Sequence, residues 1–449
     1  MAGRHLAKPS LWEMPTCSVL NMTTKTISKA KFLRGDISVP GDKSISHRTV
    51  MIGAISEGVT EISGFLKAAD PLSTISCFQS LGIDHKFDNE KLYIYGKGLN
   101  GLKQSPTTLD AGNSGTTIRL ITGILAGQKF FTKISGDQYL VKRPMKRIID
   151  PLIKMGAHIS ATEKFTAPLT IQSVETLSAI DYELPIASAQ VKSAILFAGL
   201  YANGTTRVIE HESLRDHTER MLNLTSEKNN GKTIISINGG MKLYAKQFVV
   251  PSDPSSAAFF IVAALIVPNS EIKIINVGMN PTRIGFLSVL KQLGANILIE
   301  NERTIGGEPL ADIIVKSSTL SSNCVLEGDI IPNIIDEIPI LSIAAANAVG
   351  KFEIRDAQDL RNKETDRIAA ICFNLRKMGL DVEEYKNGFA FESKKDLLSS
   401  EFDSFGDHRI AMAFGIGSLA LSGESKLKNS ECVSISFPTF WETVNTLQR

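Results

Sequence analysis

Hydroxyl and cationic side chains stand at the start of an apolar segment near the N-terminus. The run VPGDKSISHR, residues 39–48, places Lys43, Ser44 and Arg48 around a predicted helix start. A helix N-terminus exposes backbone N–H groups and carries partial positive charge, so this segment suits a phosphate or a carboxylate. A nucleotide-binding P-loop needs glycine directly before its lysine, and Asp42 stands there instead, which disfavours a kinase-like NTPase. The alternative is that one of the serines caps the helix while the lysine stays solvated.

Two further segments repeat this arrangement. The run DAGNSGTTIR, residues 110–119, places Gly115 at a helix start where backbone N–H groups again face outward. The run PIASAQVKSA, residues 185–194, offers Ser188 and Gln190 at another helix start. Each segment alone is also compatible with a simple capped turn.

Four cations cluster in DQYLVKRPMKR, residues 137–147. Such a cluster is usually a solvated face. Arg143, however, directly precedes Pro144, which favours an extended backbone that can project the side chain into a cleft.

Three segments in the second half, IPNIIDEIP, LRNKETDR and FGDHRIAMAF, mix acids and cations at predicted helix starts. Asp336 is either a functional acid or a simple N-cap. Lys363 and Arg367 are predicted to share one helix face, where their mutual repulsion favours an anion between them. The candidates from these segments are Asp336, Lys363, Glu364, Arg367 and Arg409.

The polar helix starts of both halves, taken together, indicate an anion-binding site more strongly than any one segment does. If the helices of each half run parallel, their positive ends point into a shared cleft. Cations from both halves would then surround an anionic ligand, with Asp336 and Glu364 as acid and base candidates. This pattern predicts chemistry on two small anions in a cleft that closes by domain motion.

Metal and covalent chemistry have little support in the sequence. His211 and His217 are spaced i, i+6 and do not share a helix face, so HESLRDH is predicted to be polar surface. The five cysteines (Cys17, Cys77, Cys324, Cys372 and Cys432) show no CxxC spacing, which suits reduced thiols in a cytoplasm. We therefore predict no metal and no cofactor.

The elements that must position these residues form a repeat. An apolar, alanine-rich helix followed by a turn and a short strand recurs six times, and four copies continue into a second, amphipathic helix that ends in glycine. The predicted unit is strand, buried helix, strand, outer helix and strands, and three units make each of two domains. The buried helices are predicted to begin at Ser46, Ser114, Ser188, Ser255, Glu337 and Asp407, and five of them to end in αL glycine caps at Gly58, Gly127, Gly204, Gly350 and Gly423.

Length and charge agree with this organisation. The 449 residues exceed one typical domain, and 49 Lys+Arg against 47 Asp+Glu argue against a nucleic-acid binder. The longest apolar run, residues 257–267, is too short to cross a bilayer. Residues 1–22 contain no signal peptide and are predicted to be a tag or disordered extension.

The segments PGDKSISHR, GNSGTTIR, RPM, SAQ, IPNIIDE, RNKETDR and GDHRIAMAF resemble those of the 5-enolpyruvylshikimate-3-phosphate synthase family, in the family order, between about Ile37 and Thr446. The resemblance implies an α/β fold of two similar domains, each of three βαβαββ units around buried parallel helices, an inside-out α/β barrel. It also implies that residues 23–41 plus 252–449 form one domain, that residues 42–251 form the other, and that the active site lies between them.

The implied reaction transfers the enolpyruvyl group of phosphoenolpyruvate to the 5-hydroxyl of shikimate 3-phosphate and releases phosphate, in the shikimate pathway to chorismate and aromatic amino acids. By this resemblance, shikimate 3-phosphate is bound by Lys43, Ser44, Arg48, Ser188, Ala189, Gln190, Asp336 and Lys363. Phosphoenolpyruvate is bound by Lys43, Gly115, Arg143, Gln190, Arg367 and Arg409, and the catalytic residues are Lys43, Asp336 and Glu364. The resemblance further implies a cytoplasmic monomer without nucleic-acid or membrane partners.

Some positions depart from the family pattern. Many members carry a lysine shortly before the C-terminal Phe-Pro pair, and VSISFPTF has none. Ala189 is serine in many members, so a contact there must use the backbone. The alternatives are a UDP-N-acetylglucosamine enolpyruvyl transferase, which carries Lys-Asn where this chain has Lys43-Ser44, and a non-catalytic repeat scaffold, which would need no paired acids and bases.

Overall fold

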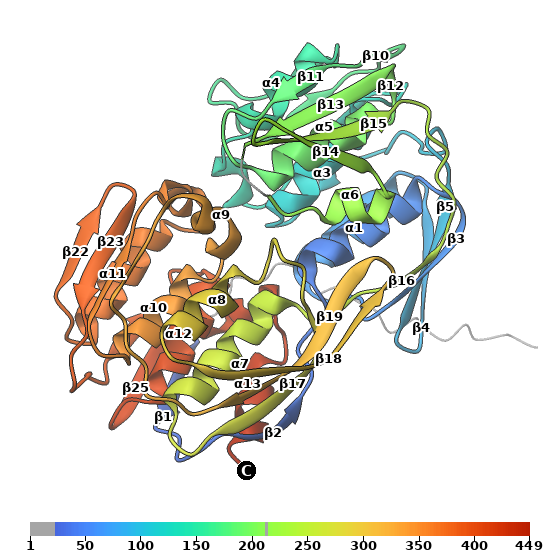
Figure 1. Cartoon of the computed structure of the whole chain (residues 1–449). Helices are drawn as coiled ribbons and strands as arrows, with labels where there is room; N and C mark the ends of the chain where they lie inside the picture. Colours follow the sequence, from blue (N-terminus) through green and yellow to red (C-terminus); the bar gives the residue numbers. More distant parts are fainter. Residues whose placement is uncertain (1–22, 212–213) are drawn as a thin grey trace, which may run out of the picture.

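The computed structural model describes residues 23–211 and 214–449, so the predicted extension at 1–22, with Cys17, lies outside the described residues. The chain forms two lobes (Figure 1), each around its own cluster of buried hydrophobic side chains. The central lobe takes this cluster from Ile45 to Val250. The terminal lobe takes it from two stretches, Ile27–Val39 and Ala257–Leu447.

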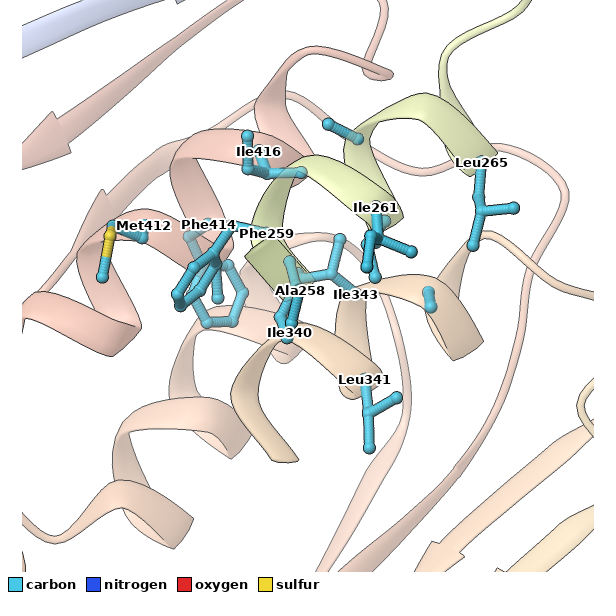
Figure 2. Close-up of a cluster of buried hydrophobic side chains, with 14 of the residues drawn as sticks. Ala258, Phe259, Ile261, Leu265, Ile340, Leu341, Ile343, Met412, Phe414 and Ile416 are labelled. Atoms are coloured by element: carbon cyan, nitrogen blue, oxygen red, sulfur yellow. The ribbon is translucent and has the colours of Figure 1, made fainter. Parts of the chain in front are cut away.

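Each lobe surrounds three buried helices, as the six apolar segments predict. They are α1 (Lys43–Ala54), α3 (Gly115–Leu125) and α5 (Ala189–Gly199) in the central lobe, and α7 (Pro254–Ile266), α10 (Ile338–Ala346) and α12 (His408–Ser418) in the terminal lobe. Every residue of α10 is buried, and in α7 only Ile266 is partly exposed. Figure 2 shows Ile261, Ile343 and Phe414, one from each helix of the terminal lobe, gathered in one cluster. Helices that are apolar on all sides are stable only when enclosed in this way.

Small sheets cover these helices, and five of them share one strand pattern: a parallel pair followed by two antiparallel strands. In the central lobe they are β16 (Gln247–Val249), β3 (Glu57–Ser63), β5 (Lys91–Lys97), β4 (Asp84–Asp88); β6 (Leu109–Asp110), β7 (Thr132–Ser135), β9 (Leu169–Ile171), β8 (Ile159–Ser160); and β11 (Asp181–Glu183), β13 (Thr205–Glu210), β15 (Lys232–Asn238), β14 (Thr225–Asn229). In the terminal lobe they are β2 (Arg34–Ile37), β17 (Glu271–Gly278), β19 (Glu308–Lys316), β18 (Asn296–Ile305); and β20 (Cys324–Leu326), β21 (Lys351–Ile354), β23 (Gly388–Glu392), β22 (Val382–Tyr385). A three-stranded sheet of β1 (Thr24–Ser28), β25 (Glu424–Lys428) and β24 (Glu401–Asp403) and a parallel pair of β10 (Leu177–Ser178) and β12 (Ala202–Asn203) complete the set. Within the described ranges no sheet closes into a barrel.

The two lobes exchange their leading strands. Strand β2 pairs with β17 of the terminal lobe and then leads into α1 of the central lobe. Strand β16 pairs with β3 of the central lobe and then leads into α7 of the terminal lobe. The two crossing segments lie side by side, since Gly41 and Ser252 form an antiparallel bridge, Asp42 N donates to Pro251 O at 2.8 Å and Asp253 N donates to Pro40 O at 2.9 Å.

Outer helices follow the buried ones. The four predicted from the sequence are present as α2 (Ala69–Ser80), α4 (Lys146–Lys154), α8 (Gly285–Gln292) and α11 (Arg367–Lys377). The shorter helices are α6 (His217–Leu222), α9 (Ile331–Ile334) and α13 (Phe440–Leu447), with 3-10 turns η1 (Leu140–Lys142), η2 (Gly328–Ile330), η3 (Gln358–Asn362) and η4 (Ser430–Ile435).

The prediction that glycines cap the buried helices was wrong. The C-cap residues of those helices are Ile55, Ala126, Leu200, Asn347 and Leu419, and Gly127 does not have a positive φ. The other four glycines, Gly58, Gly204, Gly350 and Gly423, have φ of 106, 102, 122 and 94° and lie where the next strand begins, because there the chain reverses direction. Left-handed glycines end the outer helices instead, where Gly82, Gly156, Gly294 and Gly379 directly follow the C-cap residue with φ of 86–95°.

The helix starts agree with the sequence at four positions, Ser114, Ser188, Glu337 and Asp407, and differ at two. Ser114, Ser188 and Asp407 accept bonds from the backbone of the following turn as predicted. Asp42, not a serine, caps α1, and Asp253 caps α7. Glu337 occupies the cap position of α10, but its side chain accepts from Ser255 Oγ and not from the backbone of that helix. Among the described residues, no helix is long and apolar enough to span a membrane.

Candidate active site

Charged side chains from both lobes meet at the helix starts between them. Arg215 of the central lobe contacts Asp336 of the terminal lobe at 2.6 Å. Two further pairs bridge the lobes, Arg147 with Asp359 at 3.3 Å and Arg143 with Glu364 at 3.8 Å. Figure 1 shows α3 and α5 on one side of this region and α9 and α10 on the other. The helix starts predicted to carry the chemistry therefore do share one region.

Lys43 is the first residue of α1 and stands beside the crossing segments. Its Nζ lies 2.5 Å from Asp70 Oδ2 of α2, and its backbone N–H donates to Asp253 at 3.1 Å. The adjacent Ser44 uses its carbonyl to accept from Arg48 Nη1 at 2.9 Å. The ammonium group of Lys43 thus contacts the central lobe, and the backbone N–H of Lys43 contacts the terminal lobe.

Arg48 is buried one turn into α1. Its Nε donates to Thr218 at 2.7 Å and its Nη2 to Ser193 at 2.8 Å. Burial lowers the pKa of Arg48 to about 10, so the guanidinium stays charged at neutral pH. Two neutral hydroxyls and the carbonyl of Ser44 hold this cation in place.

A second arginine, Arg119, lies beside Gly115 and Gln190, and the sequence analysis did not select it. Arg119 Nη1 donates to Gln190 Oε1 at 2.6 Å, and Gln190 Nε2 donates to Thr116 at 3.1 Å. A Cβ on Gly115 would lie 2.9 Å from Arg119 and 3.2 Å from Arg143, so glycine permits both guanidinium groups to approach the start of α3. Burial, with Arg147 and Arg143 nearby, lowers the pKa of Arg119 to about 9.

The remaining predicted residues of the central lobe also lie here. Ser188 caps α5 through Val191 N, at 3.4 Å, and Ala189 is the first residue of that helix. Arg143 is buried, and its Nη2 donates to Asn113 at 2.6 Å. The backbone of Arg143 is extended, with ψ of 139°, as the following proline predicts.

Asp336 is not an N-cap but an anion among arginines. Besides Arg215, it lies 3.2 Å from Arg367 and 3.7 Å from Arg409. Burial alone would raise the pKa of its carboxyl, but Arg409 and Arg215, followed by Lys363 and Arg367, hold that pKa well below the usual value.

Glu364 is held in the same way. Its Oε2 lies 2.5 Å from Arg367, and Arg143 approaches Oε1 at 3.8 Å. These two arginines outweigh burial and keep the pKa of Glu364 well below its usual range. Both candidate acids are therefore ionised, and each neutralises arginines that are predicted to bind anions.

The prediction that Lys363 and Arg367 share a helix face was wrong. Asp366 caps α11 through Ala369 N, so the helix begins at Arg367, and Lys363 directly follows the preceding 3-10 turn. Lys363 pairs with Asp359 at 3.2 Å. Arg367 is fully buried and contacts Asp407 at 2.7 Å as well as the two candidate acids.

His217 was also misassigned, since it is buried rather than on a polar surface. Its Nδ1 lies 2.9 Å from Glu308, and Arg283 Nη1 lies 3.3 Å from its Nε2. Arg283 in turn contacts Asp42 at 2.7 Å and Asp253 at 3.2 Å. His211 is exposed, as predicted. Within the described part of the chain, no group of three or more His, Cys, Asp or Glu residues could hold a metal ion.

Sequence reasoning thus missed Arg119, Arg215 and Arg283. Arg119 lies four residues after Gly115, as Arg48 does after Ser44, so helical spacing could have revealed it. Arg215 and Arg283 contact residues far away in the chain, and no local pattern marks them.

Known proteins resemble this chain over most of its length. A family model described as EPSP synthase (3-phosphoshikimate 1-carboxyvinyltransferase) matches residues 27–444. A 3-phosphoshikimate 1-carboxyvinyltransferase of Geotalea uraniireducens is 49% identical over 427 residues, which cover 93% of this chain and 98% of that protein. The solved structure of an EPSP synthase from Acinetobacter baumannii is 44% identical, with a TM-score of 0.84 over 95% of this chain and 98% of that one. The enolpyruvyl transferase NikO from Streptomyces tendae, 14% identical, matches in fold alone with a TM-score of 0.74, over 94% and 96% of the two chains.

Proposed function

The chain belongs to the EPSP synthase family and is a 3-phosphoshikimate 1-carboxyvinyltransferase of the shikimate pathway, and we propose that the charged cluster between its lobes carries out the transfer. The enzyme moves the enolpyruvyl group of phosphoenolpyruvate onto shikimate 3-phosphate. The predicted enolpyruvyl transferase fold is confirmed by the match to the Acinetobacter baumannii structure. The observation that supports the site is the convergence of Lys43, Arg143, Asp336 and Glu364 from separate segments of both lobes.

The two substrates are proposed to take neighbouring positions in this cluster. Shikimate 3-phosphate binds at the starts of α1 and α5, through Lys43, Ser44, Arg48, Ser188, Ala189, Gln190, Asp336 and Lys363. Phosphoenolpyruvate binds beside the start of α3, through Lys43, Gly115, Arg143, Gln190, Arg367 and Arg409. The short contacts from Arg119 to Gln190 and across Gly115 to Arg143 support this second position, because they concentrate positive charge there.

The chemistry is addition followed by elimination. Asp336 accepts the proton of the substrate 5-hydroxyl while that oxygen bonds to C2 of phosphoenolpyruvate, and Glu364 with Lys43 handles the proton that goes to C3. That proton comes from the Lys43 ammonium, because Glu364 is ionised. The C2–O bond to phosphate then breaks, C3 returns its proton to Lys43, and the proton taken up by Asp336 leaves with the phosphate. Arginines stabilise the anionic intermediate. Because phosphoenolpyruvate takes over Arg367 and Arg409, the attraction of these two groups for Asp336 weakens, which raises the proton affinity of Asp336 for the first step.

The organisation of the chain is part of the same proposal. The domains comprise residues 23–41 plus 252–449 and residues 42–251, a division supported by the two separate hydrophobic clusters. The enzyme acts as a cytoplasmic monomer, and the balance of 49 cationic and 47 anionic residues supports the absence of a nucleic-acid partner. A UDP-N-acetylglucosamine enolpyruvyl transferase is not favoured, because the matched family and the relatives are of the shikimate type.

The test is phosphate release from phosphoenolpyruvate with shikimate 3-phosphate or UDP-N-acetylglucosamine as the acceptor. Release is expected with the first acceptor only, and its absence there contradicts the assignment. Asp336→Asn should retain binding of both substrates while turnover falls by about a hundredfold or more. The control is Asp329→Asn, which alters an exposed carboxylate on the nearby 3-10 turn and should leave turnover unchanged. If Asp336→Asn loses binding but keeps its residual turnover, Asp336 has a structural role.

A further inference from the structure

A chain of buried polar groups runs beneath the proposed substrate site from α1 to the start of α3. His47 Nδ1 lies 2.7 Å from Thr74 Oγ1, which lies 2.7 Å from Thr117 Oγ1. Thr117 Oγ1 then donates to Ser114 Oγ at 2.8 Å, and Ser114 also accepts from Thr117 N at 3.0 Å. All four residues are fully buried. The chain joins three helices, with Thr74 of α2 as the middle link.

The protons in this chain must run in one direction. Because Thr117 gives its hydroxyl proton to Ser114, it is the acceptor in its bond with Thr74, which at 2.7 Å is shorter than its contacts with Ser73 Oγ at 3.3 Å and His47 Nδ1 at 3.5 Å. Thr74 has then used its own proton, so His47 Nδ1 must carry a hydrogen and donate it to Thr74. Within residues 23–211 and 214–449, the buried His47 Nε2 has no hydrogen-bond partner, which fits a neutral ring with a bare Nε2. Burial and the nearby Lys43 and Arg48 lower the pKa of His47 well below its usual value, in agreement with a neutral ring.

The hydrogen-bond chain ends at Ser114, the residue that caps the start of α3. Ser114 is the N-cap, and Gly115 next to it allows Arg119 and Arg143 to approach. The middle link belongs to the helix that also carries Asp70, the partner of Lys43. Aligned hydrogen bonds in a dry interior polarise and strengthen one another, so a break at one link weakens the far end.

We propose that His47, Thr74 and Thr117 are positioning residues that hold the Ser114 cap, and with it the phosphoenolpyruvate end of the site, in its binding geometry. This inference rests on the proposed function, because it assigns the start of α3 to phosphoenolpyruvate. None of the three residues has to touch a substrate. Since α1 has its own cap at Asp42, a break at Thr74 should disturb the α3 end and leave the shikimate 3-phosphate end in place.

Thr74→Val removes the middle hydroxyl and nearly conserves the volume. The KM for phosphoenolpyruvate should rise about tenfold, the ratio that corresponds to roughly 1.4 kcal/mol, while kcat and the KM for shikimate 3-phosphate stay within about twofold. Thr74→Ser keeps a hydroxyl and should restore the wild-type KM. The matched control is Thr122→Val, because Thr122 is a buried threonine of α3 that bonds only its own helix, at Ile118 O.

A spectroscopic measurement tests the chain independently of activity. In 15N NMR, His47 of the wild type should show the neutral tautomer with hydrogen on Nδ1, and Thr74→Val should lose that preference. If Thr74→Val does not fold, Thr117→Val tests the next link with the same readouts. The inference is overturned if the KM for phosphoenolpyruvate is unchanged, if both KM values rise equally, or if Thr122→Val has the same effect. If the wild type releases no phosphate from phosphoenolpyruvate, the proposed function fails. The tautomer of His47 still tests whether the hydrogen-bond chain from His47 to Ser114 exists.

Discussion

Replacing Arg283 with methionine should cost a large part of the stability of this enzyme. The guanidinium is about 2% exposed and contacts Asp42 at 2.7 Å, Asp253 at 3.2 Å and Ser255 at 2.9 Å. Asp42 and Asp253 cap α1 and α7, so Arg283 ties together the two segments that cross between the lobes. Removal of one partner from a buried ion pair costs about 3–5 kcal/mol, because the remaining charge stays buried without compensation. That loss is a large share of the roughly 5–15 kcal/mol that stabilises a typical protein.

The dependence on pH makes this prediction specific. Burial tends to raise the pKa of Asp42, but Arg283 and His217 outweigh it and lower the pKa from 3.8 to about 2. A carboxyl with a depressed folded-state pKa stabilises the protein above pH 3.8, and this stabilisation is lost as the pH falls toward 2. The shift corresponds to about 2 kcal/mol. The stability difference between wild type and Arg283→Met should therefore be largest near pH 7 and should narrow by about that amount as the pH falls from 4 to 2.

Urea unfolding followed by circular dichroism, without substrates and at several pH values, measures this difference. The control is Arg376→Met, because Arg376 forms an exposed pair with Glu384 at 3.4 Å and should change the free energy of unfolding by less than about 1 kcal/mol. A loss below 1 kcal/mol for Arg283→Met at pH 7, or a loss that is the same at every pH, would refute the reasoning.

Two further substitutions test the surroundings of the site. Lys192→Met removes the buried ammonium that lies 2.7 Å from Glu210 and 2.6 Å from Glu219, so the free energy of unfolding should fall by about 3–5 kcal/mol. The KM for shikimate 3-phosphate should also rise, because the neighbouring Ser193 holds Arg48. Gly115→Ala places a methyl group about 2.9 Å from Arg119 Nη1, so kinetics should show a several-fold higher KM for phosphoenolpyruvate; an unchanged KM would mean that Arg119 moves aside at no cost.

Features set by neighbouring residues could be predicted from the sequence. The caps at Ser114 and Asp407 were predictable because each cap bonds a backbone N–H within three residues. The buried helices were predictable because their apolar character is continuous, as in α10. The family resemblance implied which segments of the two halves lie together at one site. Hydrophobic periodicity describes single helices and strands and does not contain this information.

Features that depend on tertiary contacts could not be predicted. The partners of His217, Glu308 and Arg283, lie 91 and 66 residues away in the chain. A buried histidine and a surface histidine look alike in a single sequence, and only the approach of β19 distinguishes them. The misplacement of Lys363 has a local cause, since Asp366 competes successfully for the cap of α11 and delays the helix by four residues.

The crossing of the chain explains why Lys43 suits a role shared by both substrates. It is the first residue after the crossing segment, and it contacts Asp70 in the central lobe and Asp253 in the terminal lobe. We expect a rotation of the lobes about the bridge between Gly41 and Ser252 to move nearby atoms least, so Lys43 should keep its position. The pairs of Arg215 with Asp336 and of Arg143 with Glu364 join residues farther from that bridge in the chain, and the same rotation should separate them. On this hypothesis, closure brings the acids and arginines of the two lobes to a lysine that is already in place, an order of assembly that suits a two-substrate reaction in a closing cleft.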